Sequence, residues 1–166
     1  PPEEKFNQEA FLSGGIGKLT PLEEGEVFDL GGKTLEVVAL PGHTHGSIGL
    51  LYREEKVLFT GDAINGAVVL YLPECGNIAQ YIATLEKAKK LDFTRMVQSH
   101  NNKIVDREAL DVYLSVAQRV DWEAAEPYVN NGKVAPNVRI MCREGMHQQD
   151  ILKPDFAGII FSKDKL

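Results

Sequence analysis

Cysteine, long apolar runs and excess positive charge are all scarce in this chain of 166 residues. Its two cysteines, Cys75 and Cys142, lie far apart and outside any CxxC spacing, so the sequence indicates neither a zinc knuckle nor a disulfide framework. No apolar stretch approaches the ~20 residues that span a bilayer, so we expect no membrane anchor. Eighteen basic residues against 24 acidic ones leave a net charge of -6, which disfavours nucleic acid as a partner. A reducing, cytoplasmic setting is the expectation.

The length suits one compact domain over residues 1–166. Short apolar runs separated by turn residues predict two hairpins in its first part. The first joins strands at 27–30 and 34–40, and the second joins strands at 47–52 and 56–60.

Helical spacing of apolar residues appears twice after the hairpins. One amphipathic helix is predicted from Ile78 to Ala88, with Asn77 as its N-cap. A second is predicted to begin at the N-cap Asp106 and to end before Pro127. The composition of residues 3–12 is also compatible with a helix.

The remaining segments are shorter. Residues 63–72 are predicted to form an apolar loop, and strands are expected at 96–99, 138–142 and 156–161. This mixture of strands and helices predicts a layered domain of the α/β (α+β) class.

Three metal-competent side chains each follow a predicted strand: His43, Asp62 and His100. If those strands are neighbours, the side chains converge on one sheet edge. Zinc, iron and manganese all accept imidazole and carboxylate ligands, and three protein ligands plus a water make an open catalytic site. The bound water would then become a hydroxide nucleophile near neutral pH. Taken singly, each of these residues has the simpler interpretation of a turn or capping residue.

The stretch "EGEVFDLGGKTLEVVALPGHTHGSIGLLYREEKVLFTGD", followed about forty residues later by "SHNN", resembles the second half of the metallo-β-lactamase superfamily, which includes glyoxalase II and similar hydrolases. The match covers about residues 19–120. It implies an αββα sandwich, in which two sheets pack face to face between helices and the metals lie along one edge.

The resemblance also implies roles for individual residues. His43 would be the metal-binding histidine of the third family motif, Asp62 the carboxylate that bridges two metals, and His100 the late histidine of the second metal position. One or two zinc ions are the implied cofactors, with iron or manganese as alternatives.

Neighbouring residues have supporting roles in this interpretation. Gly42 and Gly61 would permit tight turns before the ligands. Thr44 and Thr60 would orient the ligands through hydrogen bonds. His45 stands where the family often has proline, and we interpret it as a surface turn residue.

The best-known family signature, His-x-His-x-Asp-His, does not occur in these 166 residues. We therefore expect the chain to be a carboxyl-terminal portion of a longer hydrolase and to be weakly active or inactive by itself. The sheet built from residues 27–60 would lack the layer it normally packs on. An open apolar face of this kind favours a homodimer or a strand-swapped assembly, unless the strands at 138–142 and 156–161 fold back to cover it.

The leading hypothesis for function is a metal-dependent hydrolase acting on a thioester, ester or lactone-like carbonyl of a small molecule. An iron-dependent oxygenase-type relative on the same fold and a non-catalytic association domain remain alternatives. Loops at 65–76 and 130–145 would select the substrate. Tyr71, Leu72 and Cys75 are candidates for its pocket, and His147 is interpreted as a solvated loop histidine.

Overall fold

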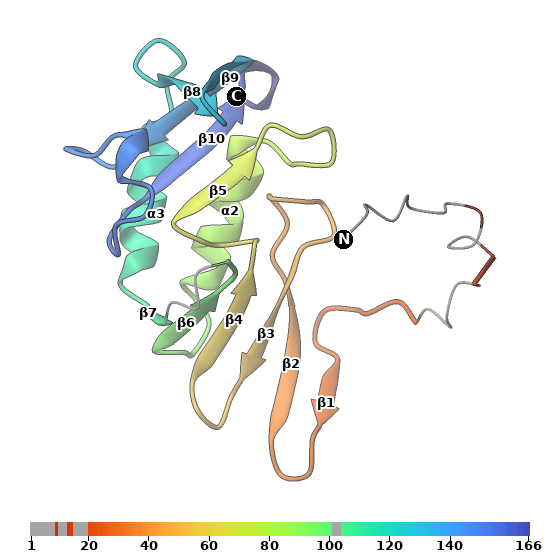
Figure 1. Cartoon of the computed structure of the whole chain (residues 1–166). Helices are drawn as coiled ribbons and strands as arrows, with labels where there is room; N and C mark the ends of the chain where they lie inside the picture. Colours follow the sequence, from red (N-terminus) through yellow and green to blue (C-terminus); the bar gives the residue numbers. More distant parts are fainter. Residues whose placement is uncertain (1–8, 10–12, 15–19, 101–103) are drawn as a thin grey trace, which may run out of the picture.

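A computed structural model describes residues 9, 13–14, 20–100 and 104–166. Apart from Glu9, the helix expected over residues 3–12 falls outside the described residues. Two sheets and two α-helices make up the described part, which confirms the predicted α/β class (Figure 1). None of the described helices combines the length and apolar character needed to cross a bilayer.

The larger sheet contains both predicted hairpins. Its six strands, in spatial order, are β1 (Val27–Asp29), β2 (Thr34–Ala39), β3 (Ile48–Tyr52), β4 (Val57–Gly61), β6 (Arg95–Gln98) and β7 (Ile104–Asp106). β1 to β4 pair in antiparallel fashion through short turns, whereas β4 and β6 are parallel. A parallel pair needs a crossover, and the segment between these two strands includes helix α2 (Ile78–Ala88).

The smaller sheet has the spatial order β5 (Ala67–Leu70), β10 (Gly158–Ser162), β9 (Lys133–Cys142) and β8 (Glu126–Asn130). β5 pairs in parallel with β10, about ninety residues further along the chain. Two 3₁₀ turns, η1 (Gln148–Asp150) and η2 (Lys163–Lys165), flank β10. This sheet lies above the larger one in Figure 1.

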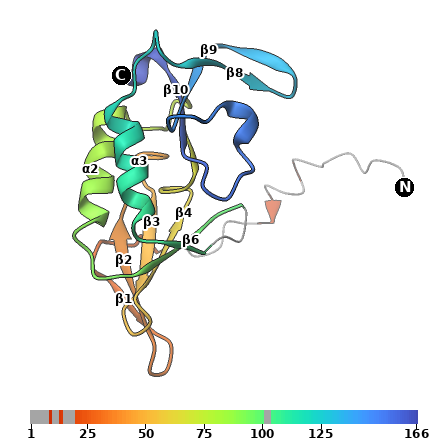
Figure 2. The same cartoon turned by 90° about the vertical axis from the view of Figure 1, so that its left-hand side faces the viewer.

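Both sheets pack against the same two helices, α2 and α3 (Ala109–Gln118), which lie along one side of the molecule in Figure 2. Leu51, Leu58 and Met96 are opposite one another on β3, β4 and β6, and all are at most 2% exposed. Buried residues of β5 and β10 belong to the same core cluster. One continuous apolar core therefore joins the sheets to the helices.

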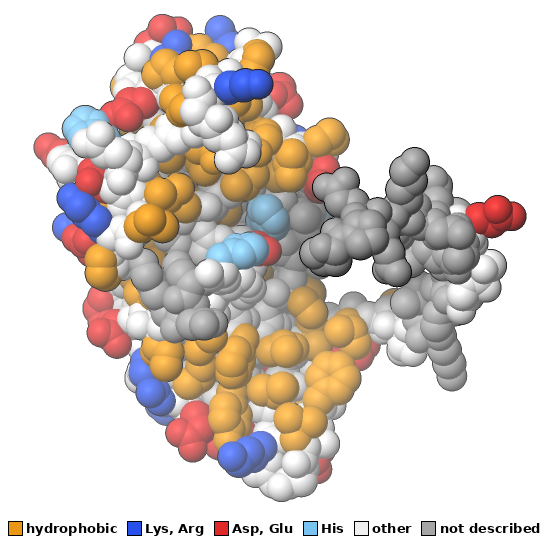
Figure 3. Space-filling model, viewed as in Figure 1, with side chains coloured by type: hydrophobic (Ala, Val, Ile, Leu, Met, Phe, Trp, Pro, Cys, Tyr) orange, Lys and Arg blue, Asp and Glu red, His pale blue; other side chains and the backbone are white. Residues whose placement is uncertain are grey.

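The opposite face of the larger sheet is partly exposed, although Val37 of β2, which pairs with Leu50 on this face, is only 1% exposed. Leu50, Phe59 and Val97 are paired across β3, β4 and β6 on that face, and Phe59 is 39% exposed. Apolar side chains spread over the lower part of this face in Figure 3. Its most exposed member is Ile104 of β7, at 65%.

Local predictions succeeded where the signals were strong. The Asn77 side chain accepts a hydrogen bond from the Gln80 amide at 2.9 Å, which confirms the predicted N-cap. Asp106, however, is the last residue of β7 and does not cap a helix, because α3 begins three residues later, at Ala109, with Glu108 in the N-cap position.

Three strands were also missed: β5, β7 and β8. Residues 67–70, predicted as loop, form β5, because the backbone groups of this short apolar run pair with those of β10. β8 contains Pro127, which lacks an amide donor and usually argues against a strand. Here β8 is the outermost strand of its sheet, where a proline is tolerated.

Candidate metal centre

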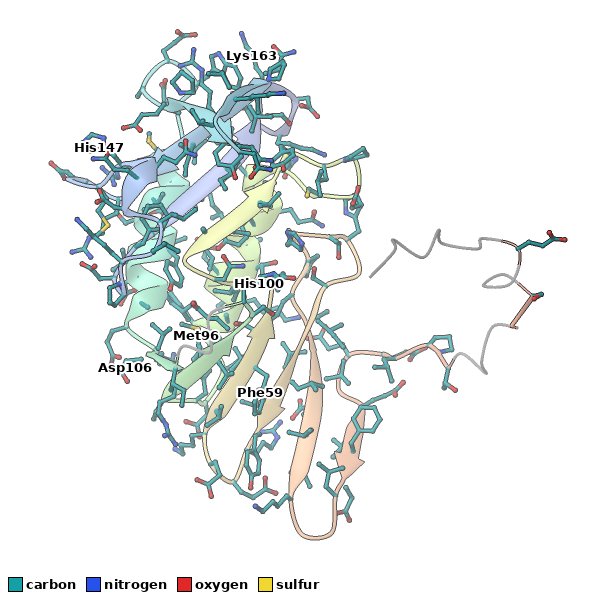
Figure 4. The ribbon with its side chains drawn as sticks, in the orientation of Figure 1. Phe59, Met96, His100, Asp106, His147 and Lys163 are labelled. Carbon is teal, nitrogen blue, oxygen red and sulfur yellow. The ribbon has the colours of Figure 1, made fainter. Side chains whose placement is uncertain are left out.

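Asp62 and His100 come together because the strands before them are parallel neighbours. Gly61 at the end of β4 pairs with Gln98 at the end of β6, and the Ser99 amide donates to the Gly61 carbonyl at 3.3 Å. The carboxyl ends of parallel strands meet at the same edge of a sheet. His100 Nε2 consequently lies 2.8 Å from Asp62 Oδ1, and Figure 4 shows His100 just beyond the arrowhead of β4.

The Asp62 carboxylate has an unusual environment. Its Oδ1 atom is buried and accepts no hydrogen bond from any described residue. The 2.8 Å separation from His100 is thus a close contact without the alignment of a hydrogen bond. A buried carboxylate oxygen needs a compensating partner. A cation held between the two side chains would supply it, since carboxylate and imidazole are its preferred ligands.

The backbone at His100 is also unusual. Its φ is +72°, a value that few non-glycine residues adopt. Such conformations cluster at functional sites, where the surrounding structure maintains them. The His100 side chain is 78% exposed and therefore open to a ligand or substrate.

His43 leaves the same end of the sheet two strands away. β2 is parallel to β4 because both are antiparallel to β3, and two strand spacings amount to about 10 Å. His43 Nδ1 lies 3.0 Å from the carbonyl oxygen of Val69. A carbonyl can only accept, so Nδ1 is the donor, and Nε2 is the nitrogen with the lone pair in the neutral ring. Metal-binding histidines commonly have a backbone contact of this type.

The three predicted ligands do not form one compact cluster. Among residues 20–100 and 104–166, no group of three or more His, Cys, Asp or Glu side chains is arranged to hold a metal ion. The structure therefore brings Asp62 and His100 into contact, and it does not show His43 completing a three-residue group with them. Metal binding by all three residues stays a prediction.

The glycines before the ligands have conformations that suit tight turns. Gly61 adopts a φ of +54°. Gly42 passes close to helix α2, where an added Cβ atom would lie 3.1 Å from the Tyr81 ring.

The threonines contact turns rather than the proposed ligands. Thr60 is buried, and its hydroxyl donates to the Ile64 carbonyl at 2.7 Å, which closes the turn around Asp62. Thr44 exchanges a hydrogen bond of 2.8 Å with Ser47 in the turn after β2. They therefore orient Asp62 and His43 through the backbone. His45 is exposed in the same turn, as expected of a surface residue.

A cavity of about 210 Å³ adjoins His100. Asn65 lines it, from the loop predicted at 65–76, but Tyr71, Leu72 and Cys75 do not. Cys75 is buried in the core and Leu72 packs against it. Tyr71 instead packs on Tyr128, with their ring centroids 6.3 Å apart.

Sequence reasoning missed the other walls of this cavity. They come from residues 151–154, Phe156, Gln98 and Tyr113. The loop predicted at 130–145 contributes none of them, and much of it is strand β9. A polar glutamine inside the apolar strand "MVQS" was the one available signal for Gln98.

His147 has a specific partner. Its Nδ1 contacts a carboxylate oxygen of Glu126, and its backbone amide donates to Asp150 at 2.9 Å at the start of η1. The hydrogen bond and charge of Glu126 raise the pKa of His147. His147 braces a surface loop and does not belong to the candidate site.

Comparison with known proteins identifies the family. Residues 2–100 match the family description "Metallo-beta-lactamase superfamily". A segment of 71 residues is 39% identical to the acyl-coenzyme A thioesterase MBLAC2 of Gallus gallus, covering 42% of this chain and 25% of that protein. A segment of 42 residues is 50% identical to the hydroxyacylglutathione hydrolase GloC of Haemophilus influenzae, covering 25% of this chain and 20% of GloC.

Solved structures share the fold. A metallo-beta-lactamase from Pontibacter korlensis superimposes with a TM-score of 0.51 at 21% identity, over 67% of this chain and 53% of that one. The superfamily protein ST1585 from Sulfolobus tokodaii gives a TM-score of 0.50 at 23% identity, over 76% and 50%. The match thus spans about a quarter of the curated thioesterase and about half of each solved structure. The match over residues 2–100 and the shared fold together establish that the chain belongs to the metallo-beta-lactamase superfamily.

Proposed function

We propose that this chain carries part of the active site of a metal-dependent hydrolase that cleaves thioesters. The observation on which this rests most directly is the buried Oδ1 atom of Asp62, which accepts no hydrogen bond from a described residue and lies 2.8 Å from His100 Nε2. Members of the superfamily are metal-dependent, which agrees with a cation at this position.

His43, Asp62 and His100 would hold the ion. Zinc suits two imidazoles and a carboxylate, and iron or manganese accept the same donors. A divalent ion bound there would polarise a carbonyl group and acidify a water molecule.

The chain's own groups prepare the site for this role. The Val69 carbonyl selects the tautomer of His43 that leaves Nε2 available. Gly61 and Thr60 hold the turn that presents the Asp62 carboxylate at the sheet edge. The exposed His100 ring leaves one side of the site accessible to a substrate carbonyl.

Thioesters are the preferred substrate class because of the relatives' names. MBLAC2 is called an acyl-coenzyme A thioesterase, and AgnL7 of Paecilomyces divaricatus, 39% identical over 67 residues, is called an atrochrysone carboxyl ACP thioesterase. With only three candidate ligands in this chain, we expect weak metal affinity and low activity.

Zinc affinity tests the proposal directly. Zinc, iron and manganese would be titrated into the metal-free chain and followed by calorimetry, with elemental analysis of the purified protein. We expect zinc to bind, and His43→Ala and Asp62→Asn each to weaken binding by about 10-fold or more.

His45→Ala is the matched control, because His45 lies in the same turn and is exposed. This variant should bind zinc as the unmodified chain does. Equal zinc affinity in the His43→Ala and His45→Ala variants would contradict the assignment of His43. Binding of no divalent ion at all would refute the metal site.

A further inference from the structure

The cavity beside His100 is enclosed by segments from distant parts of the chain. Its walls come from residues 65–67 before and in β5, residues 98–100 at the end of β6 and just after it, and residues 151–154 before β10, together with Tyr113 of α3 and Phe156. His100 lies on both the candidate metal centre and this cavity. The candidate metal centre and the cavity therefore adjoin each other at His100.

Two buried polar side chains face each other in the cavity wall. Gln98 is 5% exposed and Tyr113 is 7% exposed, and Gln98 Nε2 lies 2.9 Å from the Tyr113 hydroxyl oxygen. This bond uses one donor of the amide and one acceptor site of the phenol. The phenol proton and the amide oxygen have no partner among the described residues.

With the amide in the opposite orientation, its oxygen would accept from the phenol, and the amide nitrogen and the phenol oxygen would be left for a ligand. In either orientation the pair therefore offers a ligand one donor and one acceptor. Burial raises the pKa of Tyr113, so its phenol stays protonated. Polar groups in a cavity wall that can still form hydrogen bonds discriminate between ligands that complete those bonds and ligands that do not.

The rest of the wall is mixed, because the polar residues Asn65, Ser99 and Lys153 line it together with apolar ones. Ala67, Ile151, Pro154 and Phe156 contribute carbon surface around the polar pair. The volume of about 210 Å³ is somewhat larger than a 150 Å³ apolar cavity that accepts benzene. It therefore suits a group of about six heavy atoms.

We propose that this cavity binds the acyl chain of the substrate, and that Gln98 and Tyr113 select short acyl groups that carry a hydroxyl or oxo oxygen. The assignment rests on the proposed hydrolase function, since that function places the scissile carbonyl beside His100. Tyr113 contacts the substrate chain and takes no part in bond cleavage.

Binding of two matched thioesters to the metal-free full chain tests the proposal. The ligands are the β-hydroxybutyryl and butyryl thioesters of N-acetylcysteamine, followed in two-dimensional amide NMR spectra. We expect the hydroxylated ester to bind about 10-fold more tightly, as one additional hydrogen bond provides. Both esters should shift the amide signals of Ala67, Ile151 and Phe156.

Tyr113→Phe removes only the hydroxyl and should abolish the preference while keeping the affinity for the butyryl ester. Tyr128→Phe, whose ring stacks on Tyr71 away from the cavity, should leave the preference intact. A Tyr113→Phe variant that still prefers the hydroxylated ester would overturn the proposal. Equal loss of both affinities would also overturn it, because that result indicates a structural role.

The two proposals fail separately. The ester titrations use metal-free protein, whereas the hydrolase proposal is tested by zinc binding. If the chain binds the esters selectively but binds no zinc, the hydrolase proposal is refuted and the ester selectivity of the cavity stands. If the chain binds zinc but Tyr113→Phe does not change the ester preference, only the acyl-binding proposal is refuted.

Discussion

Gly61 shows how one residue at a strand end controls the candidate site. It directly precedes Asp62 and has a φ of +54°, in the left-handed region. An added Cβ atom would meet nothing closer than the Ser99 hydroxyl, at 3.8 Å. The requirement for glycine here is therefore conformational, because the space for a larger side chain exists.

Replacement of Gly61 by alanine should cost roughly 1–2 kcal/mol of unfolding free energy, since alanine is strained in the left-handed region. Zinc affinity should fall as well, because the Asp62 carboxylate moves. Gly61→Asn is the control, since asparagine tolerates this conformation better. Urea denaturation measures the loss of stability, and zinc titration measures the loss of affinity. A Gly61→Ala variant as stable as the original chain would show that backbone strain does not explain the glycine at this position.

His147 provides a prediction about pH at the same scale. Its contact with Glu126 raises its pKa, so the contact stabilises the fold below the ordinary histidine pKa of about 6.5. This contribution is lost as the pH rises through the raised value. In Glu126→Gln, NMR titration should find the pKa of His147 closer to its ordinary value. Glu123→Gln should leave it unchanged; a shift of the same size there would show that the Glu126 contact is not the cause.

At the scale of elements, strand β4 separates a buried face from an open one. Leu58 is fully buried against the helices, whereas its neighbour Phe59 is 39% exposed on the opposite face. Phe59 is labelled on the near side of β4 in Figure 4. Side chains alternate between faces along a strand, so these adjacent residues report on two different environments.

Truncation of the two residues should have unequal effects. Leu58→Ala leaves a cavity in the core and should lower the unfolding free energy by about 2–5 kcal/mol. Phe59→Ala should cost about 1 kcal/mol or less, because its ring is partly solvated already. Denaturant unfolding of both variants at low protein concentration makes the comparison. Equal losses of unfolding free energy in the two variants would mean that the open face is covered in solution.

For the whole molecule, the open face of the larger sheet raises the question of association. Phe28 and Ile48 are each exposed by more than a third, and Ile104 of the edge strand β7 by 65%. Contiguous apolar surface of this kind marks interaction sites. We expect the isolated chain to form a homodimer or a strand-swapped assembly through this face.

Analytical ultracentrifugation over a range of concentrations should detect this association. Phe59→Glu places a charge in the middle of the face and should shift the protein to monomer. Val134→Glu, at an exposed position of the smaller sheet, should not. A chain that is monomeric at every concentration would exclude the association.

Much of this protein was determined by local sequence alone. The hairpins from β1 to β4 follow from apolar runs interrupted by turns, and helix α2 follows from its period and the cap at Asn77. The positions of Asp62 and His100 after strands were likewise visible. These features depend on contacts between residues close in the chain, which a short pattern can specify.

Tertiary structure alone decided the remaining features. Parallel pairing of β4 with β6 brings Asp62 beside His100, and pairing with β10 makes a strand of residues 67–70. The contact between Gln98 and Tyr113 likewise joins a strand to a helix. In such pairings, backbone groups far apart in the sequence form hydrogen bonds with one another. Many segments could pair in this way, and only the packed core selects which segments meet.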